Sequence, residues 1–119
     1  MQYMLLIYTD PTAGLTPGTQ EFADMLIRYS KANEAYHADG VYKAGDALQP
    51  PSTATTVKVR NGKVQTMDGP FAETKEMLAG YYLLDCPDLD AAIKYAAMIP
   101  GAEIGSIEVR PVVDLTKFR

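Results

Sequence analysis

Two segments of the chain are apolar on both of their alternating faces, and this constrains the fold more than any other feature. Residues 2–9 (QYMLLIYT) and 79–85 (AGYYLLD) combine strand-forming residues with apolar side chains at almost every position. Because successive side chains of a strand point to opposite sides, each segment presents an apolar surface above and below its sheet. We therefore expect the sheet to be covered on both faces.

The sequence predicts two helices. Apolar residues recur at three- and four-residue spacing from Phe22 onward, which indicates a helix with Thr16 as its N-cap that ends near Asp39. A second helix is expected over 89–99, with Asp88 as its N-cap and with Leu89, Ala92, Ile93 and Ala96 facing inward. Two helices can cover only one face of a sheet.

A β-hairpin is expected in the middle of the chain. Residues 54–60 and 63–67 are rich in β-branched residues and flank Asn61-Gly62, a strong signal for a two-residue hairpin turn. Further strands are expected over 41–48 and 104–113. The order is then strand, helix, strand, hairpin, strand, helix, strand. It predicts one domain, residues 1–119, with an α+β ferredoxin-like sandwich in which an antiparallel sheet carries two helices on one face.

The sheet face without helices needs another cover. A second copy of the same sheet is the simplest source, so we expect a homodimer whose two sheets form a barrel-like α+β assembly.

Composition narrows the classes of partner and the compartment. The formal net charge is −4 and the basic residues are scattered, which argues against direct binding of nucleic acid. The single cysteine, Cys86, excludes an internal disulfide and fits a reducing cytoplasm. The first residues lack the basic start of a signal peptide, and no apolar run approaches the length of a membrane span.

Asp68 is the first candidate for chemistry. It opens the stretch Asp68-Gly69-Pro70-Phe71, which is typical of a tight turn. Its carboxylate could bond only to its own backbone. Alternatively, a carboxylate held at the end of a strand and facing a pocket could orient a base or act as one.

Tyr29 and Asn33 are the second candidate pair. They lie one turn apart on the apolar side of the first predicted helix, where a buried amide needs a partner. Asn33 could be a satisfied core amide, or this face could look into a pocket where both side chains bind a ligand.

Three other residues are weaker candidates for ligand binding. His37, the only histidine, is expected near a helix end and partly exposed. Glu73 and Lys75 are expected on a solvated face, although Lys75 could bind an anionic substrate. A lone histidine and a lone cysteine leave no zinc constellation, and we expect neither a metal nor a cofactor.

One stretch carries a family resemblance. Residues 68–76 (DGPFAETKE), with Gly80-Tyr81-Tyr82 after them, resemble the signature of the DGPF proteins of the YCII-related superfamily. Residues 3–8 (YMLLIY), 44–50 (AGDALQP) and 107–111 (IEVRP) resemble the same pattern.

The resemblance implies a ferredoxin-like fold, a dimer and, in some members, a lyase or hydrolase that uses a histidine–aspartate pair. Asp68 stands where the aspartate is expected, and Tyr29 stands where the histidine is expected. The pair would then be Tyr29 and Asp68, within hydrogen-bond reach across a pocket.

Two alternatives to a pocket remain open. DGPF proteins are also similar to domains associated with extracytoplasmic-function sigma factors, which implies a non-catalytic binding or regulatory module. In the other alternative, the loop at Asp68 is purely structural.

Overall fold

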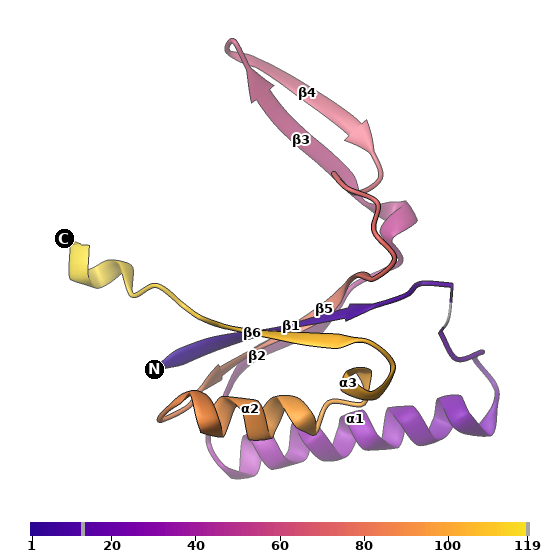
Figure 1. Ribbon diagram of the computed structural model, residues 1–119, viewed down its shortest axis with the longest axis vertical. Coiled ribbons are helices and arrows are strands. Elements are labelled where there is room, and N and C mark those ends of the chain that lie inside the picture. The colour runs from indigo at the N-terminus through magenta and orange to yellow at the C-terminus, as the bar shows by residue number, and fades with distance from the viewer. Residues whose placement is uncertain (13, 119) are drawn as a thin grey trace.

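The fold is an antiparallel four-stranded sheet with helices on one face. A computed structural model describes residues 1–12 and 14–118 (Figure 1). The strand order in the sheet is β2-β5-β1-β6, and the strands are β1 (Gln2–Thr9), β2 (Tyr42–Ala47), β5 (Met77–Asp85) and β6 (Ser106–Pro111). The helices are α1 (Gln20–Ala38), α2 (Leu89–Ala97) and the short α3 (Gly101–Ile104). The predicted ferredoxin-like α+β fold is confirmed.

The caps of the two long helices were predicted with different success. Asp88 caps α2 as expected, because its carboxylate accepts a hydrogen bond from the Ala91 amide. The N-cap of α1 is Thr19, whose hydroxyl accepts from the Phe22 amide, so the prediction of Thr16 was wrong. Gly18 has φ of +90° and turns the chain after Pro17, so the N-cap lies three residues later than predicted.

None of the helices in residues 1–12 and 14–118 has both the length and the apolar character that a membrane crossing requires.

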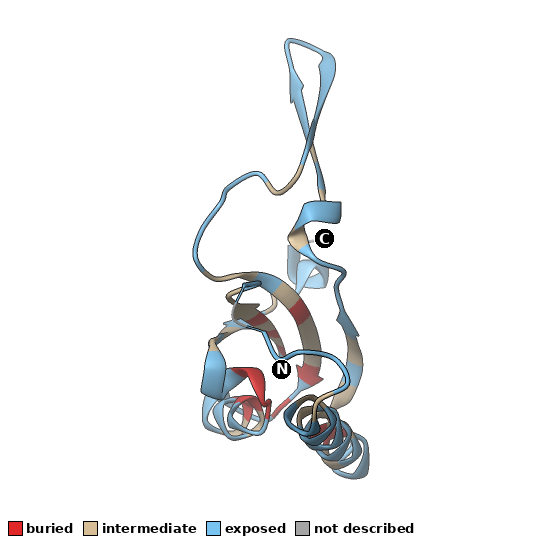
Figure 2. Cartoon of the chain, turned by 90° about the vertical axis from the view of Figure 1, so that its right-hand side faces the viewer, coloured by how far each residue is buried: buried red, intermediate tan, exposed pale blue. Residues whose placement is uncertain are grey.

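The core lies between the sheet and the helices. Three alternate side chains of β1, Tyr3, Leu5 and Ile7, are buried on the helix side (Figure 2). Tyr36 of α1 is fully buried against them in the same cluster. Its hydroxyl donates a 2.6 Å hydrogen bond to the Tyr95 carbonyl, which satisfies the one polar atom that the ring carries into the core.

The other face of the sheet has no helix on it. Its apolar side chains belong to the two central strands, and the register places them in opposite pairs: Met4 with Leu83, Leu6 with Tyr81, and Tyr8 with Leu78. We call these six residues the open face. All six are only half-buried or exposed. The sequence predicted that both faces of the sheet are covered, but within a single chain only the helix face is covered.

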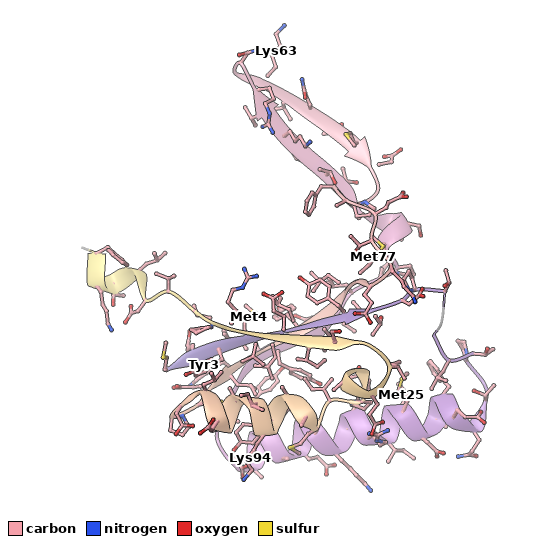
Figure 3. All side chains as sticks on the ribbon, in the orientation of Figure 1. Tyr3, Met4, Met25, Lys63, Met77 and Lys94 are labelled. Carbon is pink, nitrogen blue, oxygen red and sulfur yellow. The ribbon has the colours of Figure 1, made fainter. Side chains whose placement is uncertain are left out.

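The predicted hairpin is confirmed, and it projects away from the sheet. β3 (Thr55–Arg60) and β4 (Lys63–Asp68) pair around Asn61-Gly62, both of which have positive φ as a tight hairpin turn requires. We call residues 55–68 the arm. It rises on the side of the sheet opposite the helices, with Lys63 at its tip (Figures 1 and 3). A 3₁₀ turn, η1 (Pro51–Thr53), precedes it, and another, η2 (Leu115–Phe118), follows β6.

Several strand boundaries differ from those expected: β2 is one residue shorter at each end, and β6 ends at Pro111 instead of residue 113. β5 starts at Met77, two residues early. β6 starts at Ser106, because Gly101–Ile104 form α3 where a strand was expected to begin. Gly105 makes this change of direction possible, since a Cβ there would lie 2.1 Å from the Tyr8 carbonyl oxygen.

Candidate functional site

A cleft of about 780 Å³ lies between α1 and the β2 side of the sheet. Its size is that of a small-molecule site. Most of its lining is apolar, and the side chains with polar groups are few: Thr9, Tyr29, Asn33, Tyr42, Asp46, Tyr81 and Tyr82. Phe22, Met25 and Leu26 of α1 supply much of the apolar wall.

Tyr29 and Asn33 bring hydrogen-bonding groups to the helix wall of the cleft. Both are half-buried, and their spacing of four residues puts them on one side of α1. Burial raises the pKa of the Tyr29 phenol, although a hydrogen bond from the Gly101 backbone acts in the opposite direction. Tyr29 is therefore protonated near neutral pH and acts as a hydrogen-bond donor. Among the described residues, the Asn33 amide makes no side-chain hydrogen bond, so it is available to a ligand.

Two glycines shape the sheet wall. A Cβ at Gly45 would lie 2.6 Å from Cδ1 of the Tyr82 ring, and a Cβ at Gly80 would lie 2.9 Å from the Asp46 carbonyl oxygen. The absence of side chains at both positions lets the Tyr82 ring lie close against β2. Burial raises the pKa of Tyr82, which keeps this phenol protonated too.

Asp46 and Tyr81 border the cleft, but their side chains form a hydrogen-bonded pair on the open face, because Tyr81 lies opposite Leu6 and Asp46 lies opposite Tyr81. The Tyr81 hydroxyl donates to Asp46 Oδ2 at 2.9 Å, and this bond to a carboxylate raises the pKa of Tyr81. Asp46 is the one charged residue among the described residues of the lining, and its carboxylate points away from Tyr29. Neither residue was singled out for chemistry from the sequence, because the pair depends on the strand order and register.

His37 lies behind the cleft wall and is not part of the lining. It is exposed near the end of α1, as expected, and its ring packs on Tyr42 at a centroid distance of 4.1 Å. Tyr42 does line the cleft. His37 therefore supports a lining residue.

Asp68, Glu73 and Lys75 lie outside the cleft. Asp68 is the last residue of β4, opposite Thr55, and is exposed. Glu73 and Lys75 are exposed in the segment that returns from the arm to the sheet. Among the described residues, no hydrogen bond joins Asp68 to Tyr29. The cleft of one chain thus contains Tyr29 and Asn33 of the predicted residues and lacks Asp68, Glu73, Lys75 and His37.

The chemistry available in the cleft is limited. Its groups are phenols held protonated and an amide. Among the described residues of the lining, no carboxylate faces Tyr29, because the Asp46 side chain lies on the open face. Across residues 1–12 and 14–118, no group of three or more His, Cys, Asp or Glu side chains is placed to hold a metal ion.

Comparison with known proteins gives two matches that span nearly the whole chain. The family described as the YCII-related domain matches residues 1–116. An uncharacterized protein of Rhizobium meliloti (strain 1021) is 36% identical over 114 residues, which cover 94% of this chain and 92% of that protein.

Proposed function

The chain belongs to the YCII-related family, and we propose that it binds a small molecule in the cleft between α1 and the sheet. The observation that carries the proposal is the cleft itself: a largely apolar hollow of about 780 Å³ into which a few polar groups converge. Tyr29 and Asn33 would donate hydrogen bonds from the helix wall. Tyr42 and Tyr82 bring hydroxyl groups to the sheet wall.

The charge of the lining indicates the class of ligand. Lys, Arg and His are absent from the described lining, and the Asp46 carboxylate lies on the open face. A buried anion needs a paired cation or several donors, so carboxylates and phosphates are disfavoured in the cleft, and no carboxylate of the lining faces it to pair with a cation. We infer a neutral, ring-containing ligand that accepts hydrogen bonds from Tyr29 and Asn33.

A comparison of three ring compounds of similar size tests this ligand class. Benzylamine, benzyl alcohol and benzoate differ mainly in the charge of the substituent, and ligand-observed NMR would rank their binding. We expect benzyl alcohol to bind at least tenfold more tightly than benzylamine or benzoate. Equal or stronger binding of either charged compound would contradict the proposal.

Substitutions that each remove one polar group of the helix wall test whether the ligand binds in the cleft. Tyr29→Phe and Asn33→Leu should each weaken benzyl alcohol binding about threefold to tenfold, which is the usual range for a neutral hydrogen bond. Tyr8→Phe is the matched control, because it removes a hydroxyl on the open face. Mass spectrometry of the protein purified from its native source would identify a co-purified ligand.

Acid–base catalysis of a lyase or hydrolase type is the finer form of the proposal. It requires a base beside the donor Tyr29. The family resemblance favours Asp68 for this role. Once a substrate is known, Asp68→Asn should lose turnover while retaining binding, and Asp46→Asn is the control because its carboxylate lies on the open face.

We also propose that the protein is a homodimer that covers the open face. Six apolar side chains on that face have no helix over them, and a second copy of the same face would bury them. Leu6→Glu should dissociate such a dimer.

We also propose a cytoplasmic location. Cys86 is a buried free thiol, which is consistent with a reducing compartment.

A second candidate function is a non-catalytic regulatory module that associates with an extracytoplasmic-function sigma factor. The observation in its favour is the segment after β6, where Leu115 and Phe118 are exposed. Co-expression with such a factor would test it: loss of co-purification in Phe118→Ser, but not in Tyr29→Phe, would support this module over the cleft.

A further inference from the structure

The arm is amphipathic across its two faces. Residues directly opposite in an antiparallel pair share a face, so the register assigns each side chain to one side. One face, which we call the valine face, carries Thr55, Val57, Val59, Val64, Thr66 and Asp68. The opposite face carries the three basic residues Lys58, Arg60 and Lys63. This alternation is the pattern of a sheet with one face against a core and one in water.

Nothing in the described part of the chain covers the valine face. The exposed fractions of Val57, Val59 and Val64 are 59%, 58% and 69%. Every residue of β4 is exposed, and so is every residue of β3 except the half-buried Thr56, as the largely pale-blue arm in Figure 2 shows. An isolated two-stranded hairpin is marginally stable in water, so a projecting arm with a bare apolar face needs a surface to pack on.

The protomer as a whole is too open for a monomer of its mass. Its accessible surface is 8337 Å², whereas a compact 13.0 kDa protein exposes about 6,300 Å². Its radius of gyration is 16.5 Å, against about 13.5 Å for a compact domain of this length. The excess, about 2,000 Å², is larger than the roughly 800 Å² that each partner buries in a standard interface.

The charge distribution favours a second copy as the partner. The arm carries three of the eleven Lys and Arg residues and one of the fifteen Asp and Glu residues. The rest of the chain therefore holds eight basic and fourteen acidic residues. Three carboxylates lie beside or on the helix-free side of the sheet, Asp46, Glu76 and Glu108, against one guanidinium, Arg110. The basic side chains lie on the face opposite the valine face, so they attract the acidic body of a second copy at long range without forming the contact itself.

The base of the arm directs it toward the same side as the open face. The Gly69 amide donates to the Ala54 carbonyl at 2.7 Å, and the Thr56 hydroxyl donates to the Gly69 carbonyl at 2.8 Å. These bonds close the arm at its root, and the arm then rises on the side away from the helices (Figure 1). A body seated on the open face would therefore lie alongside the arm.

We propose that the arm grips the flank of a second copy of this chain, with its valine face against that copy. The proposal rests on the homodimer proposed above and extends it from the open face to the arm. It also gives the Asp68-Gly69 pair a role: Gly69 sets the root of the arm, and Asp68, on the valine face, is carried into the interface.

A pair of neighbouring substitutions tests the arm. Val64→Glu and Gln65→Glu add the same side chain and the same charge at adjacent positions on opposite faces. Sedimentation equilibrium over a concentration series should show the dimer Kd raised at least tenfold by Val64→Glu and less than threefold by Gln65→Glu. Both positions are exposed, so both variants should keep the wild-type circular dichroism spectrum.

The outcomes separate the arm from the dimer. A wild-type protein that is monomeric at every concentration overturns both proposals. A dimer that Leu6→Glu dissociates and Val64→Glu leaves intact overturns the arm alone.

Photo-crosslinking shows which copy the arm contacts. Benzoylphenylalanine would replace Val59 on the valine face or, as the control, Lys58 on the basic face. In an equimolar mixture of ¹⁵N-labelled and unlabelled protein, only contacts between copies give crosslinked peptides of mixed isotope content. We expect mixed peptides from position 59 and few from position 58. Peptides of a single isotope content would place the arm on its own chain and overturn the proposal.

Discussion

The Tyr81 hydroxyl donates a 2.9 Å hydrogen bond to the Asp46 carboxylate, and this bond ties the central strand β5 to the edge strand β2 on the open face. It is a cross-strand contact between residues 35 positions apart, and it holds the carboxylate away from the cleft. Because a carboxylate that accepts from a phenol opposes the phenol's ionisation, the pKa of Tyr81 is raised.

Asp46→Asn should therefore lower the pKa of Tyr81 toward its ordinary value of about 10. The substitution keeps an acceptor for the hydroxyl but removes the negative charge. The ¹³Cζ chemical shift of Tyr81, followed by NMR from pH 8 to 12, measures the change.

Tyr95 supplies the control, because its hydroxyl donates to Asp39 at 2.8 Å in the same way. Asp39→Asn should lower the pKa of Tyr95 and leave Tyr81 unchanged. Equal shifts of both tyrosines in both variants would rule out the paired bonds as the cause.

Tyr36→Phe should lower the free energy of unfolding at pH 7 by about 1–2 kcal/mol. The change removes the hydrogen bond to Tyr95 and leaves a carbonyl oxygen near the core with one donor fewer. Urea denaturation at pH 7 measures it. A loss below about 0.3 kcal/mol would mean that water replaces the bond without cost.

The same residue should make the fold sensitive to alkali. Burial raises the pKa of Tyr36 above that of an unfolded tyrosine, so its contribution is fully present below about pH 10 and is lost as the pH rises toward the folded-state value. Between pH 10 and 11.5, the free energy of unfolding should fall less steeply for Tyr36→Phe than for the wild type. Urea denaturation at several pH values gives the two slopes.

Thr19→Ala should destabilise the protein by about 1 kcal/mol, because it removes the hydroxyl that accepts from the Phe22 amide. Thr16→Ala is the matched control, since only the Thr16 carbonyl takes part in the turn before α1. Thermal denaturation of the two variants compares them. A larger effect at Thr16 would move the start of the helix back to the position that the sequence suggested.

Gly69→Ala should disturb the root of the arm. Gly69 has φ of +91°, where an alanine is strained by about 1 kcal/mol or more. Hydrogen exchange of the Gly69-to-Ala54 bond should accelerate in the variant. Gly14→Ala, at a glycine without positive φ and with open space around its Cα, should leave that exchange rate unchanged.

Local signals predicted most of the fold. The Asn61-Gly62 turn, the Asp88 cap and the apolar spacing of α1 each depend on residues close in sequence, and all three are confirmed. The errors also have local causes. Thr16-Pro17 has the composition of a helix start, but Gly18 follows it in a conformation that no helix contains.

The candidate site was harder to predict because it depends on how distant segments meet. Tyr29 and Asn33 were identified from one helix and do line the cleft. The pairing of Asp46 with Tyr81 requires the strand order and register, which spacing alone does not reveal. Leu89 and Ile93 were expected to face inward on α2 and are instead largely exposed, because the small residues Ala92 and Ala96 make the close packing. Asp68 leaves the cleft because its hairpin leaves the sheet.

The arm enters and leaves the fold through the ends of β2 and β5, two strands that are neighbours in the sheet. None of its residues belongs to the buried core. During evolution, mutations could therefore change the length of the arm or its charged residues while the core and the cleft walls stay the same. Duplicated copies of such a gene could diverge in which chain they accept as a partner, and still share one ligand.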